Sequence, residues 1–229
     1  MRVKSLILAS SAAGALALSA GAASAEPNGW YGAIDAGWHM PNVETNRSID
    51  EVDVDDDWVG LARLGYRFTP NWRVEIEAGH RPGSIRELTA SGVPALCHLT
   101  SSATTCMSPD GDVKSTSLMV NMIHDFGGAD AGFRPFIGLG AGINRVNTDF
   151  VGLVAANRAV RIDAHDHSNR LAAQALAGLA FAMGERGHID LTYRYLISNM
   201  EFEAGSLGEF EGRYEDHSVT LGLRYAFGA

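Results

Sequence analysis

The sequence lacks a long hydrophobic run beyond its first 25 residues, and basic residues are few. A membrane-spanning helix needs about 18 or more consecutive apolar residues, and no stretch after Glu26 reaches that length. An exported chain without such a helix is either soluble or a closed β-barrel, because only barrels can otherwise span a bilayer. The 27 acidic residues outnumber the 18 lysines and arginines, which argues against nucleic acid as a partner.

Cysteine is scarce. The two cysteines, Cys97 and Cys106, lie nine positions apart in a segment rich in Ser, Thr and Pro. In an exported protein such a pair is expected to form a local disulfide. In the chain-entropy model this bond contributes about 2–3 kcal/mol. A zinc site is the weaker alternative, because the spacing does not suit zinc and His98 alone lies close.

The N-terminus predicts export. Arg2 and Lys4 precede a run of apolar and small residues that ends in Ala-Ser-Ala at 23–25. This order predicts a signal peptide over 1–25, with a retained membrane helix as the less favoured alternative. Residues 26–229 are then expected to form one β domain.

Eight segments of the remaining chain alternate between apolar and other residues. They are 29–40, 58–68, 72–81, 115–126, 134–144, 170–183, 188–197 and 217–227. Residues 72–77 read Trp-Arg-Val-Glu-Ile-Glu, which places charges on one face and apolar side chains on the other. This pattern predicts an all-β fold, an eight-stranded antiparallel up-and-down transmembrane barrel with lipid outside and a polar interior. Only the Ala-rich segment 170–183 has a helix as a serious alternative.

The connections and the aromatic residues fit the same topology. Short links at 69–71, 127–133 and 184–187 alternate with long polar loops at 41–57, 82–114, 146–169 and 199–216. Outer-membrane barrels have short turns in the periplasm and long loops outside. Most aromatic residues fall near the ends of the segments, where they are expected to form belts at the two membrane interfaces.

Several motifs, taken in order, carry a family resemblance. They are Gly-Trp-Tyr-Gly-Ala at 29–33, Asn121 with Asp125-Phe126, Arg-Pro-Phe-Ile-Gly-Leu-Gly-Ala-Gly at 134–142, and Tyr-Arg-Tyr at 193–195. The sequence resembles the OmpA-like transmembrane domain, especially the short outer-membrane barrel proteins of Alphaproteobacteria. The resemblance implies location in the outer membrane of a Gram-negative cell.

The last segment looks like the C-terminal assembly signal of this family. The signal positions are Val219, Leu221, Leu223, Tyr225 and Phe227. The resemblance therefore implies that the barrel-assembly machinery and periplasmic chaperones act on the chain during biogenesis. In the family the aromatic residue usually ends the chain, whereas here two residues follow it.

The inward faces of the predicted strands are charged. The expected set is Asp35, Arg63, Arg67, Arg73, Glu75, Glu77, Asp190, Arg194 and Arg224. Five arginines and four acids are nearly balanced, and an eight-stranded barrel has room inside only for its own side chains. We expect an ion network that closes the lumen, in a protein with a structural and surface role; a narrow, low-conductance porin is the alternative.

The predicted outer loops are acidic. Asp53, Asp55 and Asp57 are weak candidates for binding a divalent cation, which prefers oxygen ligands and could link the loops to surface glycolipid. A solvated acidic face is the favoured interpretation. No cofactor is expected. We expect the protein to be a monomer that is surrounded by outer-membrane lipid.

Two further function classes remain as alternatives. His165-Asp166-His167-Ser168-Asn169 loosely resembles a segment of lipid A deacylases. In a strand, His167 and Ser168 would point to opposite faces, so the register is wrong for a nucleophile and its base, and no enzyme is expected. The other alternative is a soluble periplasmic, lipocalin-like binder.

Overall fold

The computed structural model describes residues 28–45, 51–89, 96–97, 110–128, 131–154, 157–203 and 209–227. Within these ranges the chain forms one sheet of eleven strands. They are β1 (Gly29–Thr45), β2 (Glu51–Val54), β3 (Asp57–Thr69), β4 (Trp72–Arg81), β5 (Ile85–Thr89), β6 (Leu96–Cys97), β7 (Asp110–Asp125), β8 (Phe133–Val154), β9 (Asn157–Met183), β10 (Gly187–Glu203) and β11 (Glu209–Ala226). In the described part, no helix has the length and hydropathy that crossing a membrane requires.

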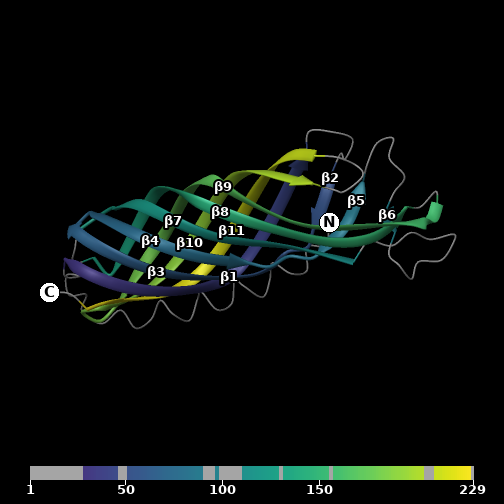
Figure 1. Cartoon of the computed structure of the whole chain (residues 1–229). Coiled ribbons are helices and arrows are strands. Elements are labelled where there is room, and N and C mark those ends of the chain that lie inside the picture. Colours follow the sequence, from purple (N-terminus) through teal and green to yellow (C-terminus); the bar gives the residue numbers. More distant parts are fainter. Residues whose placement is uncertain are drawn as a thin grey trace.

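Eight of these strands form a closed antiparallel barrel (Figure 1). Their order is β1, β3, β4, β7, β8, β9, β10 and β11, and each pairs with the next. The ring closes because β11 also pairs with β1, from Tyr31 opposite Ala226 to Thr45 opposite Gly212. The predicted eight-stranded antiparallel barrel is therefore confirmed, and the Ala-rich segment 170–183 is part of strand β9.

The barrel is apolar outside and polar inside, because successive side chains of a strand point to opposite faces. Ile34 is 67% exposed and Leu139 is 72% exposed, both on the outer surface. The neighbouring Asp35 points inward, and a Cβ added at Gly138 would also lie inside, against Leu176 and Ile123. A soluble protein has apolar side chains inside and polar ones outside. The reverse arrangement seen here is typical of a barrel that lies in lipid.

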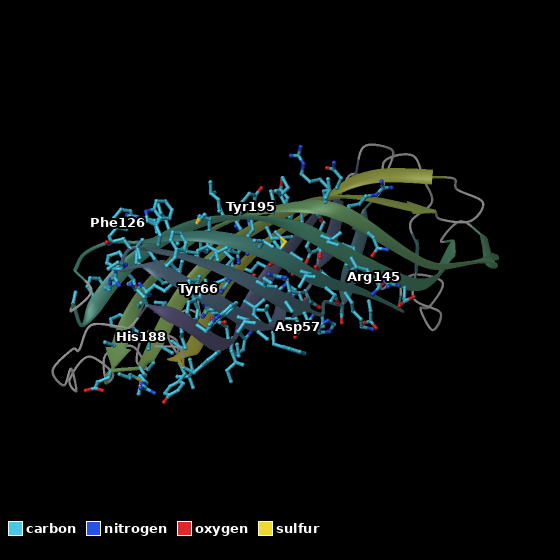
Figure 2. All side chains as sticks on the ribbon, turned by 60° about the vertical axis from the view of Figure 1, so that its left-hand side comes forward. Asp57, Tyr66, Phe126, Arg145, His188 and Tyr195 are labelled. Atoms are coloured by element: carbon cyan, nitrogen blue, oxygen red, sulfur yellow. The ribbon has the colours of Figure 1, made fainter. Side chains whose placement is uncertain are left out.

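Aromatic side chains gather on the outer surface near the short turns. Trp30 and Tyr66 stack edge to face with ring centroids 5.2 Å apart. Phe126 follows directly after β7, and its ring centroid lies 4.7 Å from that of His124 on β7. Tyr66 and Phe126 lie toward one end of the barrel, and Asp57 and Arg145 toward the other (Figure 2). The aromatic belt marks the membrane interface at the short-turn end.

The long connections are not loops over most of their described length, and the predicted loop ranges were wrong in this respect. Strands β8 and β9 stay paired from Phe133 opposite Phe181 to Val154 opposite Asn157. They extend beyond the barrel at the end where β2, β5 and β6 lie (Figure 1). Antiparallel backbone pairing needs no apolar face. These extensions therefore lack the alternation by which the sequence reveals lipid-facing strands.

The short turns at the opposite end have a clear local cause. Gly127 and Gly184 adopt positive φ angles of 87° and 78°, which residues with a side chain rarely adopt. These glycines lie in the short connections from β7 to β8 and from β9 to β10. The predicted difference between short turns and long excursions is therefore present in the structure.

Candidate functional site in the barrel interior

The inward residues singled out by the sequence all lie inside the barrel, and none is more than 5% exposed. They are Asp35, Arg63, Arg67, Arg73, Glu75, Glu77, Asp190, Arg194 and Arg224. They come from five strands, β1, β3, β4, β10 and β11.

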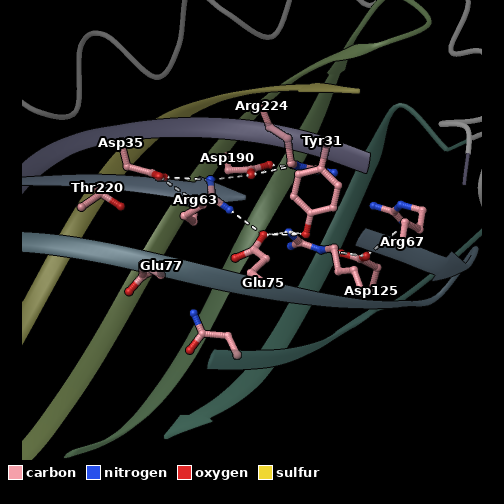
Figure 3. A network of polar contacts seen from close by, with 12 residues as sticks. Tyr31, Asp35, Arg63, Arg67, Glu75, Glu77, Asp125, Asp190, Thr220 and Arg224 are labelled. Carbon is pink, nitrogen blue, oxygen red and sulfur yellow. Dashed lines mark hydrogen bonds and ion pairs between the residues drawn. The ribbon is translucent and has the colours of Figure 1, made fainter. Parts of the chain in front are cut away.

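Arg63 is the centre of the network and joins four strands (Figure 3). Its Nε and Nη2 atoms donate to the two carboxylate oxygens of Asp35, at 2.7 and 2.9 Å. Its Nη1 donates to Glu75 at 2.9 Å, and its Nη2 also donates to Asp190 at 3.0 Å. One guanidinium on β3 therefore connects β1, β4 and β10. Charge-assisted hydrogen bonds of this kind are the stronger ones in proteins.

Arg224 and Tyr31 extend this centre toward the short turns. Arg224 forms a two-pronged contact with Asp190, at 3.0 and 3.1 Å. The hydroxyl of Tyr31 donates to Glu75 at 2.7 Å. The guanidinium carbons of Arg73 and Arg224 lie 5.8 and 5.4 Å from the centroid of the Tyr31 ring, within the range of cation–π attraction.

A second group lies next to the centre, toward the outer end. Arg194 donates from Nε to Glu77 at 3.0 Å and from Nη1 to Thr220 at 2.5 Å. Gln174 donates to Glu77 at 3.0 Å and to Asn121 at 2.7 Å. Both oxygens of the Glu77 carboxylate are therefore engaged by side chains of other strands.

The expected set missed two acids that complete the interior. Asp125 lies 3.1 Å from both Arg67 and Arg73, near the short turns. Asp216 lies 3.1 Å from Nε of Arg81, near the outer end. The missing signal was available in the alternation itself, because both acids share the inward face of their strands.

Three further charged or titratable residues of the interior were missed, namely His39, Arg81 and Arg134. Nδ1 of His39 lies 2.7 Å from Asp216, and its Nε2 lies 2.6 Å from the carbonyl oxygen of Pro82. Arg134 donates to the carbonyl oxygen of Pro70 at 2.6 Å, an acceptor that Arg67 shares at 2.8 Å.

Charge inside the barrel is therefore nearly balanced. Among the described residues, the buried arginines are Arg63, Arg67, Arg73, Arg81, Arg134, Arg194 and Arg224. The buried carboxylates are Asp35, Glu75, Glu77, Asp125, Asp190 and Asp216. Seven guanidinium groups face six carboxylates, so the interior charges can largely neutralise one another without bulk ions.

The other predicted sites lie partly or wholly outside the described residues. Cys106 and the side chain of Cys97 are outside them, so the disulfide stays a prediction; the same holds for the side chains at 165–168 and for the signal peptide. The side chain of Asp53 is also outside, whereas Asp57 accepts a hydrogen bond from the backbone nitrogen of Trp58 at 2.7 Å. Within the described ranges, no group of three or more His, Cys, Asp or Glu residues is arranged to hold a metal.

The predicted assembly-signal side chains all lie on the outer surface, four of them on β11 and Phe227 directly after it. Val219, Leu221, Leu223, Tyr225 and Phe227 are between 44% and 58% exposed. Their recognition by assembly proteins stays a prediction.

A closed barrel of eight antiparallel strands, apolar outside and charged inside, is the architecture of a transmembrane β-barrel. Residues 10–227 match the family model of the outer membrane protein beta-barrel domain, and the chain belongs to this family. It is an outer-membrane protein of the Gram-negative type, as the resemblance implied. The soluble, lipocalin-like alternative is therefore wrong.

Similar proteins support this placement. The chain is 25% identical over 229 residues to a candidate adhesin of Rickettsia typhi, covering 97% of this chain and 98% of that relative. OprG of Pseudomonas aeruginosa matches with a TM-score of 0.59 and 14% identity, over 88% of this chain and 99% of OprG. Neisserial surface protein A matches with a TM-score of 0.50 and 16% identity, over 86% of this chain and 97% of that protein. The two solved structures show the shared fold.

Removing one central carboxylate tests whether water can enter the interior and solvate the buried arginines. Asp190→Ala removes the carboxylate that Arg224 contacts through two nitrogens and Arg63 through one. An arginine buried without its partner costs about 3–5 kcal/mol, so we expect the free energy of unfolding to fall by about that amount. The measurement is urea unfolding of the purified barrel in lipid vesicles, followed by tryptophan fluorescence.

The matched control is Glu185→Ala, an exposed acid in the turn between β9 and β10. It should change the free energy of unfolding by no more than about 0.5 kcal/mol. A similarly small effect of Asp190→Ala would mean that water replaces the lost carboxylate, which contradicts a dry ion network.

Proposed function

We propose that the interior of this outer-membrane barrel is closed by its own ion-paired side chains. The protein then acts at the cell surface, where it supports the outer membrane and binds through its outer segments. The observation that carries the proposal is the position of Arg63, whose guanidinium on β3 reaches acids of β1, β4 and β10. In a barrel wide enough only for its own side chains, such a bridge leaves little room for an ion path.

In this proposal the protein is not an enzyme. Each carboxylate of the central network accepts hydrogen bonds from guanidinium groups, and none is more than 5% exposed. A general acid or base must reach a substrate within hydrogen-bond distance, which these paired and buried acids are poorly placed to do.

A low-conductance pore is the second candidate, and one observation favours it. The lumen near the outer end carries small hydroxyl side chains beside the larger Arg81, His39 and Tyr214. The hydroxyl side chains are Ser115, Ser117, Ser198 and Ser218. Small polar side chains leave space that water can occupy between these larger groups, which would favour a narrow ion path at this end.

The proposed partners follow from this role. Outer-membrane lipid and surface glycolipid surround the barrel, and the assembly machinery and periplasmic chaperones act during biogenesis. Nucleic acid is not a partner in this proposal, and the protein acts as a monomer. The similarity to a candidate adhesin supports binding at the surface. The length of the β8–β9 pair supports it as well, because it extends past the barrel (Figure 1).

Conductance distinguishes a closed barrel from a pore. In a planar bilayer the native protein should give no large, stable open channel. Glu77→Ala combined with Arg194→Ala removes both members of one ion pair and leaves neither charge alone, so short openings should appear. Leu64→Ala with Ile76→Ala is the control, because this cross-strand pair lies on the outer surface. Stable channels in the native protein would contradict the closed lumen.

The surface role is tested by shortening the β8–β9 pair. Asn147 lies opposite His167, so an Asn-Gly turn joining these two residues removes the extension and keeps the barrel strands. In cells lacking the native protein, the full chain should restore surface adherence and resistance to detergent. The shortened chain should restore only resistance. Equal adherence with both chains would contradict binding through this segment.

A further inference from the structure

The outer surface of β7 and β8 changes from apolar to basic near the outer end of the barrel. Leu118 lies directly opposite Ile143, and the two side chains are 51% and 52% exposed. One outward-facing position further along each strand, Thr116 lies opposite Arg145, and both are exposed. Two residues of chain thus separate a lipid-facing pair from a pair that can bind a charged group.

A second cation lies beside the first. Lys114 is the next outward-facing position on β7, diagonal to Arg145 on the neighbouring strand. Diagonal neighbours on one face of a sheet are about 7–8 Å apart at their Cα atoms, a distance that long side chains bridge. Both cations can therefore reach one small anion between them.

Among the residues that the structure describes, neither cation has a strong partner. Nε of Arg145 donates to the side-chain oxygen of Asn147 at 3.1 Å, and no carboxylate of the described residues pairs with this arginine. Lys114 lies 3.1 Å from Asp112, with the two side chains 42% and 50% exposed. An ion pair this exposed is worth about 1 kcal/mol or less, so a better anion can replace it.

The height of these residues relative to the membrane points to the kind of anion. In a transmembrane barrel the apolar band meets the acyl chains, and the positions just beyond it meet the headgroups. On β11 the corresponding outward positions differ. They carry His217, whose ring centroid lies 4.9 Å from that of Tyr195, and the acidic Glu215. Arg145 lies at the end of the barrel opposite Phe126 and His188 (Figure 2). At this height β7 and β8 thus carry two basic side chains, whereas β11 carries a histidine and an acid.

We propose that Lys114 and Arg145 bind a phosphate group of the glycolipid in the outer leaflet. Arginine binds phosphate with two parallel hydrogen bonds, and lysine contributes a point charge. The hydroxyl of Thr116, 3.1 Å from Nδ1 of His80, lies beside them as a further hydrogen-bonding group. The site specifies the glycolipid contact of the proposed function. It does not depend on a closed lumen, which the conductance recording tests separately.

Binding of purified lipid A to the full-length protein in detergent tests this site, with native mass spectrometry as the readout. Lys114→Gln and Arg145→Gln should each weaken binding of bisphosphorylated lipid A about fivefold, since one cation near an anionic lipid surface contributes about 1 kcal/mol. The double variant should weaken it about 25-fold if the two effects add. Arg213→Gln is the matched control, an exposed arginine on β11 whose loss should leave binding unchanged.

Three results would overturn the proposal. Equal affinity of the native protein for dephosphorylated and phosphorylated lipid A would show that acyl chains alone decide the affinity. Arg213→Gln could weaken binding as much as Arg145→Gln does, which would indicate diffuse attraction without a site. Millimolar inorganic phosphate could displace the lipid, which would make the site one for free phosphate. The shift in gel mobility on heating checks that every variant is folded. The comparison of phosphorylated with dephosphorylated lipid A uses the native protein, so it does not depend on the folding of any variant.

Discussion

The pairing of β1 with β11 is the contact on which the rest of the molecule depends. This pairing leaves no free sheet edge in the barrel wall. A free edge would be unstable in lipid, because each unpaired backbone group in hydrocarbon costs several kcal/mol. Closure with eight strands also fixes a narrow interior. Every second side chain must then fit into that interior, and this chain fills it with arginines and carboxylates.

Burying so many charges is favourable only if they satisfy one another. A lone buried ion pair gains little over an apolar pair, but removing one partner is costly. In this barrel each central charge has partners on more than one strand, as Arg63 and Glu77 illustrate. The network therefore constrains the register of strands distant in sequence, and the outer surface is left free to meet lipid and external partners.

Alternation along the chain was sufficient to predict the number of strands, their antiparallel order and the faces of their side chains. It failed outside the membrane, where β8 and β9 continue as a paired ladder and no lipid imposes a pattern on their residues. The site was predicted in part. Asp125 and Asp216 have the inward orientation, but their arginine partners depend on the stagger between strands, which the sequence does not specify.

The closed lumen is tested most directly by the accessibility of a buried position to a charged thiol reagent. Thr192 is 1% exposed inside the barrel, whereas Thr116 is exposed on the outer surface. In a chain with Cys97 and Cys106 replaced by serine, Thr116→Cys should react readily. Thr192→Cys should react only after unfolding. Reaction of Thr192→Cys in the folded barrel as fast as Thr116→Cys would show a water-filled lumen and contradict the ion-paired closure.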